Sequence, residues 1–171
     1  MASLYHAVAT THLRCRHACA EQKGGSVMCA INLWAVNAAA FTPTFQEFTA
    51  QRLGIAPAID ERGIGSSLVR GSSCVFTLTK RMCDCDSLIG RGAEPAHDDE
   101  VDAQSWLDWL RELPDAVPYL SRIAVLRAWS PQGDVISPVS SRSIGIDELD
   151  EASLRVIRDD MLLTIDYSHA S

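Results

Sequence analysis

Two cysteines separated by a single residue, Cys83 and Cys85, are the part of the sequence best suited to chemistry. In an extended segment, side chains two residues apart point to the same side, so both thiols can reach one metal ion at about 2.3 Å per sulfur. Cys74 lies in the apolar segment that leads into this pair, and Cys29 opens another apolar segment. We therefore expect Cys83 and Cys85 to bind a transition metal, zinc in the first place, with Cys74 and Cys29 as further ligands and Arg81 offsetting part of the thiolate charge. Such a closed site is structural or sensory, because it leaves no open position for catalysis.

Other interpretations of these cysteines stay open. Cys29 and Cys74 lie in apolar segments, where a cysteine is an ordinary small core residue. Cys83 and Cys85 can instead form a redox pair, or one of them can act as a nucleophile beside the basic Lys80. The sequence therefore also fits a cysteine-dependent enzyme that carries out thiol exchange.

A second kind of cysteine chemistry depends on where the native chain begins. Met28 directly precedes the first apolar segment, which makes it a candidate native start. Removal of this methionine would leave Cys29 with a terminal amine beside its thiol, a base and a nucleophile in one residue. The string Met28-Cys29-Ala30-Ile31 resembles the opening of N-terminal-nucleophile amidotransferases. The resemblance implies amide chemistry at Cys29, as a variant of the enzyme alternative.

The first 27 residues contain a second group of metal-binding side chains, namely His12, Cys15, His17 and Cys19. No apolar pattern surrounds them that would build a rigid site. We interpret residues 1–27 as a flexible or incidental leader and residues 28–171 as a single domain.

The elements that must position the cysteines follow from hydrophobic periodicity. Strands are expected at 30–36, 74–79, 122–129, 134–139 and 161–167, with 122–129 and 134–139 joined as a hairpin. Helices are expected to begin near Thr44, at Asp102 and at Asp147, where capping residues precede apolar faces. The order β-α-β-α-β-β-α-β predicts an α+β fold, with a mainly antiparallel sheet of about five strands and helices packed on one face.

The composition limits the class of protein. Hydrophobic residues make up 47% of the 171 residues, enough for a sizeable core, and no run of about 18 apolar residues suggests a membrane span. No secretory signal is recognisable, so we expect a cytoplasmic protein whose cysteines are thiols or metal ligands. A net charge of −7 argues against a nucleic-acid partner.

Acidic side chains concentrate in two segments, residues 94–115 and 147–171. Solvated helix faces explain them, and they also leave open a third class of function. In that class the chain is an acidic interaction module for a protein partner that the sequence does not identify.

Overall fold

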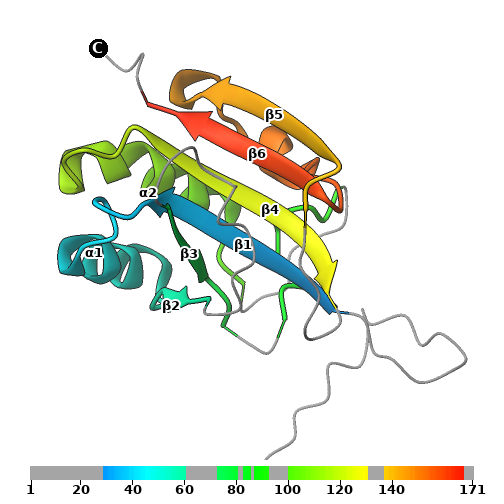
Figure 1. The fold of residues 1–171 in the computed structure, drawn as a ribbon, viewed down its shortest axis with the longest axis horizontal. Coiled ribbons are helices and arrows are strands. Elements are labelled where there is room, and N and C mark those ends of the chain that lie inside the picture. Colours follow the sequence, from blue (N-terminus) through cyan, green and yellow to red (C-terminus); the bar gives the residue numbers. More distant parts are fainter. Residues whose placement is uncertain are drawn as a thin grey trace, which may run out of the picture.

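The computed structural model describes residues 29–60, 73–80, 83–85, 87–92, 100–130 and 137–167 (Figure 1). Within them lie the strands β1 (Cys29–Asn37), β2 (Ala58–Ile59), β3 (Ser73–Thr77), β4 (Arg122–Ser130), β5 (Ser140–Gly145) and β6 (Met161–Asp166). The helices are α1 (Pro43–Leu53), α2 (Ala103–Ala116) and α3 (Glu151–Arg155), and a 3-10 turn spans Ile146–Glu148. The predicted α+β class is confirmed. The leader, residues 1–27, lies outside the described residues, as does the first half of the strand expected at 134–139, whereas residues 137–139 are described and precede β5.

The described strands form one mixed sheet of six strands in the order β2-β3-β1-β4-β6-β5. Neighbouring strands are antiparallel except β5 and β6, which run parallel. The prediction of about five strands in a mainly antiparallel sheet is therefore wrong. The strand after β4 was expected to pair with it as a hairpin, but the neighbour of β4 on that side is β6. β5 instead pairs in parallel with β6, and the segment that contains α3 forms the crossover connection between these two strands.

Tryptophan side chains join β1 to α2 on the face of the sheet that packs against the helices. Trp34 of β1 stacks on Trp106 with ring centroids 5.4 Å apart, and Trp109 meets the same ring edge-on at 5.2 Å. The helix begins as predicted at Asp102, whose side chain accepts a hydrogen bond of 2.8 Å from the Ser105 N–H. All three tryptophans are buried, so the centre of β1 is held firmly against α2.

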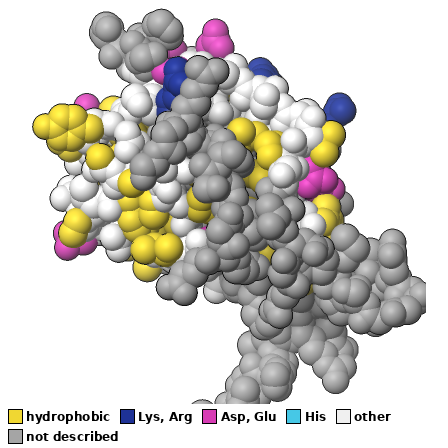
Figure 2. Space-filling view, in the orientation of Figure 1, with side chains coloured by type: hydrophobic (Ala, Val, Ile, Leu, Met, Phe, Trp, Pro, Cys, Tyr) yellow, Lys and Arg dark blue, Asp and Glu magenta, His cyan; other side chains and the backbone are white. Residues whose placement is uncertain are grey.

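The opposite face of the sheet carries a second apolar cluster around Leu33, Leu126 and Leu162. On the face drawn in Figure 2, the acidic and basic side chains that can be seen lie apart from one another rather than in a patch of one charge. None of the described helices has the length and the apolar composition needed to cross a bilayer.

The first residues of β1 differ from the rest of the strand in what lies beside them. β4 pairs with β1 from Cys29 to Val36, whereas the pairing of β3 with β1 covers only Leu33–Asn37. The sheet edge along Cys29–Asn32 is therefore left for the chain that follows β3. That chain contains Cys83 and Cys85.

Candidate metal centre

The segment Cys83–Cys85 occupies the edge of β1 that β3 leaves uncovered. The Asp84 N–H donates a hydrogen bond of 2.8 Å to the Ala30 carbonyl. The Ala30 N–H in turn donates to the Sγ atom of Cys85 at 3.3 Å. Backbone and side chain of this short segment thus take over the pairing that a neighbouring strand would otherwise supply, which fixes the segment against the start of the sheet.

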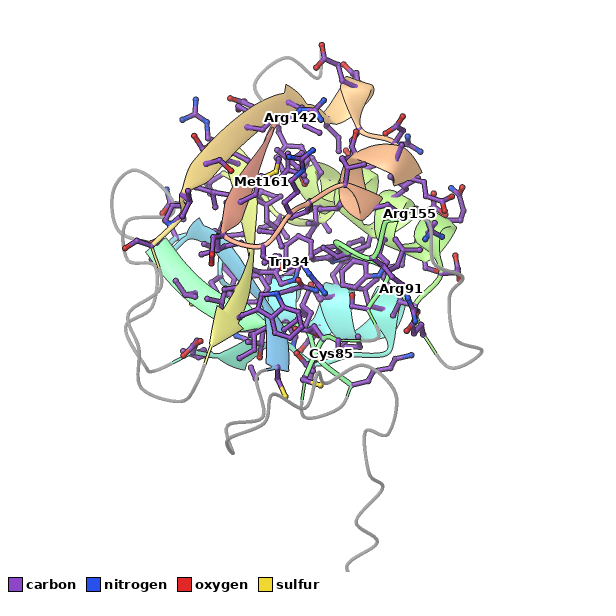
Figure 3. All side chains as sticks on the ribbon, turned by 90° about the vertical axis from the view of Figure 1, so that its right-hand side faces the viewer. Trp34, Cys85, Arg91, Arg142, Arg155 and Met161 are labelled. Atoms are coloured by element: carbon purple, nitrogen blue, oxygen red, sulfur yellow. The ribbon has the colours of Figure 1, made fainter. Side chains whose placement is uncertain are left out.

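Docking of this segment brings three cysteines together. The Sγ atoms of Cys29, Cys83 and Cys85, which we call the thiol cluster, all lie within 4.8 Å of one another. Cys83 and Cys85 are buried and Cys29 is half-buried, with Ala30 and Trp129 packed around them. Figure 3 shows Cys85 at the lower edge of the described part, below Trp34. Three of the four cysteines that the sequence singled out therefore meet at one end of β1.

Cys74 does not join the thiol cluster. In the antiparallel register it lies opposite Val36, and Val36 and Cys29 are at opposite ends of β1, roughly 23 Å apart along the strand. Cys74 is half-buried, and this burial raises the pKa of its thiol, so the neutral form is favoured. The neighbouring strands that we expected are present, but their register separates the two cysteines.

Asp84, the residue between Cys83 and Cys85 to which the sequence assigned no role, is a buried carboxyl group. Its side chain is 5% exposed. Oδ2 accepts a hydrogen bond of 2.7 Å from the Asn32 N–H and one of 3.2 Å from the Thr79 hydroxyl. Burial raises the pKa of Asp84 to about 6, although these hydrogen bonds and the charge of Arg127 act in the opposite direction.

This raised pKa predicts a pH-dependent stability in the metal-free protein. Ionisation of Asp84 opposes folding, so its stabilising contribution is present below about pH 4 and is lost as the pH rises through about 6. Asp84→Asn resembles the neutral acid. We expect this variant to exceed the wild type in free energy of unfolding by at most about 3 kcal/mol near pH 7.5, with the difference shrinking toward pH 4. Urea unfolding in the presence of a chelator, repeated across this range, measures the effect, and a difference that is independent of pH contradicts it.

Arg127 is a buried cation that ties the segment after Cys85 to β4. It lies opposite Asn32 and is 6% exposed. Nη1 donates to the Ile89 carbonyl at 2.8 Å and lies 3.5 Å from the Asp84 carbonyl, and Nε lies 3.3 Å from the Asp159 carboxylate. From the sequence, an arginine on this strand face suggests a stem over the sheet edge, or a guanidinium that stacks on Trp129 and reaches a ligand or a carboxylate. The guanidinium does reach the Asp159 carboxylate. Its further role, as a support for the cysteine segment inside the fold, was not predicted.

A pocket of about 50 Å³ lies next to the thiol cluster, and Cys83 belongs to both. Its apolar wall includes Leu78, Leu88 and Trp106, while Lys80 and Ser87 contribute polar groups. Nothing in the sequence pointed to this pocket, because its walls come from segments that are far apart in the chain.

The thiol cluster has the donor set and nearly the spacing of a metal site. Three sulfurs at about 2.3 Å from a tetrahedral ion are about 3.8 Å apart, so a shift of roughly 1 Å or less would bring these atoms to ligand distance. The hydrogen bond from the Ala30 N–H to the Cys85 sulfur is of the kind that stabilises a metal-bound thiolate. Arg81, which we expected to offset the charge, lies outside the described residues. The arrangement can hold a soft transition metal through three protein ligands.

The fold and the site thus define a small α+β protein with a preformed cluster of three thiols at one end of its sheet. Comparisons of the chain with protein-family models, with curated proteins and with solved structures found no significant match.

Proposed function

We propose that this is a metal-binding protein in which Cys29, Cys83 and Cys85 hold one transition-metal ion in a structural or sensory role. The observation that carries the proposal is the approach of these three sulfur atoms to within 4.8 Å of one another. They come from two segments that meet only in the folded chain, since Ala30 and Cys85 are 55 residues apart. An ion bound here would tie the segment after β3 to the first strand.

The chemistry of the donors supports zinc as the metal. Thiolates are soft ligands that favour zinc, copper(I) and iron–sulfur clusters over magnesium or calcium. Zinc accepts tetrahedral sulfur sites without a redox change, which suits a structural ion. The proposal includes the cytoplasm as the compartment, because glutathione there keeps thiols reduced and available to the metal.

The spacing of the cysteines also supports metal binding over plain core packing. A cysteine that serves as an ordinary small residue needs no second thiol beside it, and the half-buried Cys74 on β3 fits that role. In the thiol cluster, by contrast, three sulfurs face one another and one of them accepts a backbone N–H. This combination is what a thiolate site for a cation requires.

Zinc titration of the metal-free protein against a chromophoric chelator tests the proposal. We expect one equivalent to bind, and Cys83→Ser or Cys85→Ser to weaken the affinity by at least about 100-fold, because one of three ligands is lost. Cys74→Ser is the matched control and should leave the affinity unchanged. A variant with Cys15→Ser and Cys19→Ser controls for zinc bound by the leader. Absence of tight binding, or equal losses in Cys74→Ser and Cys83→Ser, would overturn the proposal.

A cysteine-dependent enzyme is the second candidate, favoured by the position of Cys83 on a pocket that also contains Lys80. It predicts one thiol that alkylates much faster than the others near neutral pH, Cys83 for thiol exchange or Cys29 for amide chemistry. An acidic interaction module, the third candidate, predicts neither this selectivity nor metal binding.

Alkylation with iodoacetamide, followed by peptide mass spectrometry, separates these candidates. For the metal site we expect zinc to slow the alkylation of Cys29, Cys83 and Cys85 together by at least about tenfold, because coordinated sulfur is a weaker nucleophile. The rate at Cys74 should not respond to zinc. One fast thiol whose rate is the same with and without zinc would instead support the enzyme.

A further inference from the structure

We propose that the metal of the thiol cluster takes a small thiol as its fourth ligand, and that this thiol enters through the pocket lined by Cys83. The inference rests on the proposed function and adds a ligand class to it. It also changes the expected character of the site, from a closed structural centre to one with an exchangeable position.

The number of protein ligands found among the described residues leaves a coordination position for such a molecule. A tetrahedral zinc ion needs four donors, and closed structural sites supply all four from the protein. Among the described residues, the group that can share one ion consists of Cys29, Cys83 and Cys85, and Cys74 lies at the other end of β1. Three protein ligands with an exchangeable fourth is the pattern of zinc sites that bind substrates or other external ligands.

The position of Cys83 indicates where the fourth ligand arrives. Cys83 lies in the thiol cluster and also on the wall of the pocket, whereas Cys29 and Cys85 are not part of that wall. Ala30 and Trp129 pack against the cluster, and Ala30 donates its N–H to Cys85. The pocket side of Cys83 is therefore one approach that the described residues provide for an external donor, beside the half-buried Cys29.

The size of the pocket limits the part of a ligand that it can enclose to a few heavy atoms. A volume of about 50 Å³ has room for roughly three or four water-sized groups, far less than a nucleotide or a typical cofactor needs. The apolar side chains of Leu78, Leu88 and Trp106 suit a short hydrocarbon stem. The soft ion that thiolates favour prefers sulfur to oxygen as its next donor.

The charges around the pocket are close to balanced, so an anionic sulfur would not meet a wall of net negative charge. Glu100, which also lines the pocket, has both carboxylate oxygens 2.8 Å from Nη1 of Arg91, so its charge is compensated. Asp84 and Lys80 add one acidic and one basic group to the pocket wall, and the guanidinium of Arg127, which also pairs with Asp159, lies behind Asp84. On binding, the thiol loses its proton to solvent and its sulfur replaces a water molecule on the metal.

The experiment uses the full-length protein loaded with Co²⁺, whose visible absorption reports the number of sulfur ligands. We expect 2-mercaptoethanol to produce a saturable change in this absorption, while ethylene glycol, its oxygen analogue, produces none. Lys80→Ala should weaken the apparent affinity for the thiol by about fivefold, and Lys80→Arg should retain it. Gel filtration after the titration confirms that cobalt stays on the protein.

The outcomes separate this inference from the proposed function. If cobalt binds at one equivalent but the thiol leaves the spectrum unchanged or strips the metal, the fourth-ligand proposal fails and the metal site stands. A spectrum that already indicates four thiolates, and that changes in Cys15→Ser/Cys19→Ser, likewise overturns it, because the chain itself then supplies the ligand. If no cobalt binds, both proposals fail.

Discussion

Gly90→Ala is expected to lower the free energy of unfolding by about 3 kcal/mol or more, a large effect for the addition of one methyl group. A Cβ atom on this residue would lie 2.2 Å from Cδ of Arg127 and 2.8 Å from the Ile157 carbonyl oxygen. The residue also has φ of +76°, a conformation that disfavours any side chain. Because Arg127 cannot move away without losing its bond to Ile89, the change disturbs the support of the cysteine segment. Urea unfolding of the metal-free protein measures the loss.

Gly92→Ala is the matched control for this prediction. Gly92 also has a positive φ, +68°, and its N–H donates to the Arg155 carbonyl much as that of Gly90 donates to Leu154. Among the described residues, no atom outside its chain neighbours lies within 4 Å of a Cβ built on Gly92, so only the backbone cost of about 1 kcal/mol is expected. Equal losses in the two variants would show that Gly90 does not pack on Arg127 as described.

Zinc is expected to raise the melting temperature of the protein by roughly 8–16 °C when free zinc is about 1000-fold above Kd. A ligand at that excess stabilises the folded state by about 4 kcal/mol, and each kcal/mol corresponds to about 2–4 °C in a chain of this size. The stabilisation requires the docked segment, because the three sulfurs are brought together only when Cys83–Cys85 lies against β1. Thermal unfolding followed by circular dichroism, with zinc and with a chelator, measures the shift.

Two variants show whether this shift comes from the thiol cluster. Cys85→Ser removes one of the three sulfurs and should abolish most of the shift, whereas Cys74→Ser should keep it. A rise of the same size in both variants would mean that zinc stabilises the chain elsewhere. A wild type whose melting temperature does not respond to zinc would contradict a structural role for the metal.

Local patterns in the sequence predicted most of the elements around the site. Alternating apolar residues marked β1, and Asp102 marked the start of α2 through a capping interaction that the structure contains. The spacing of Cys83 and Cys85 indicated that their thiols share a side, and both lie with Cys29 in the thiol cluster. These features depend on neighbours in the chain, which a sequence displays directly.

The parts that the sequence did not predict depend on register and on long-range packing. Cys74 was expected near Cys29 because their strands were expected to be neighbours, but the antiparallel register places it opposite Val36. The parallel pairing of β5 with β6 arises from a crossover through α3, which competes with an equally plausible hairpin after β4. No local pattern distinguishes these alternatives.

The burial of Asp84 and Arg127 was not predicted, for a related reason. In the sequence, an acid placed between two cysteines resembles a solvent-exposed charge. An arginine in an apolar strand does so too. Both are buried because the segment after β3 folds over the start of β1 and covers them. A charged residue at an inward-facing strand position was the one available signal, since such a charge must find partners inside the fold.

The metal content of the protein, purified without an affinity tag and measured by mass spectrometry of the elements, tests the metal site most directly. The thiol cluster predicts about one equivalent of zinc per chain, lost in Cys83→Ser and kept in Cys74→Ser. Less than about 0.2 equivalents of any transition metal in the wild type, with no change in Cys83→Ser, would contradict it.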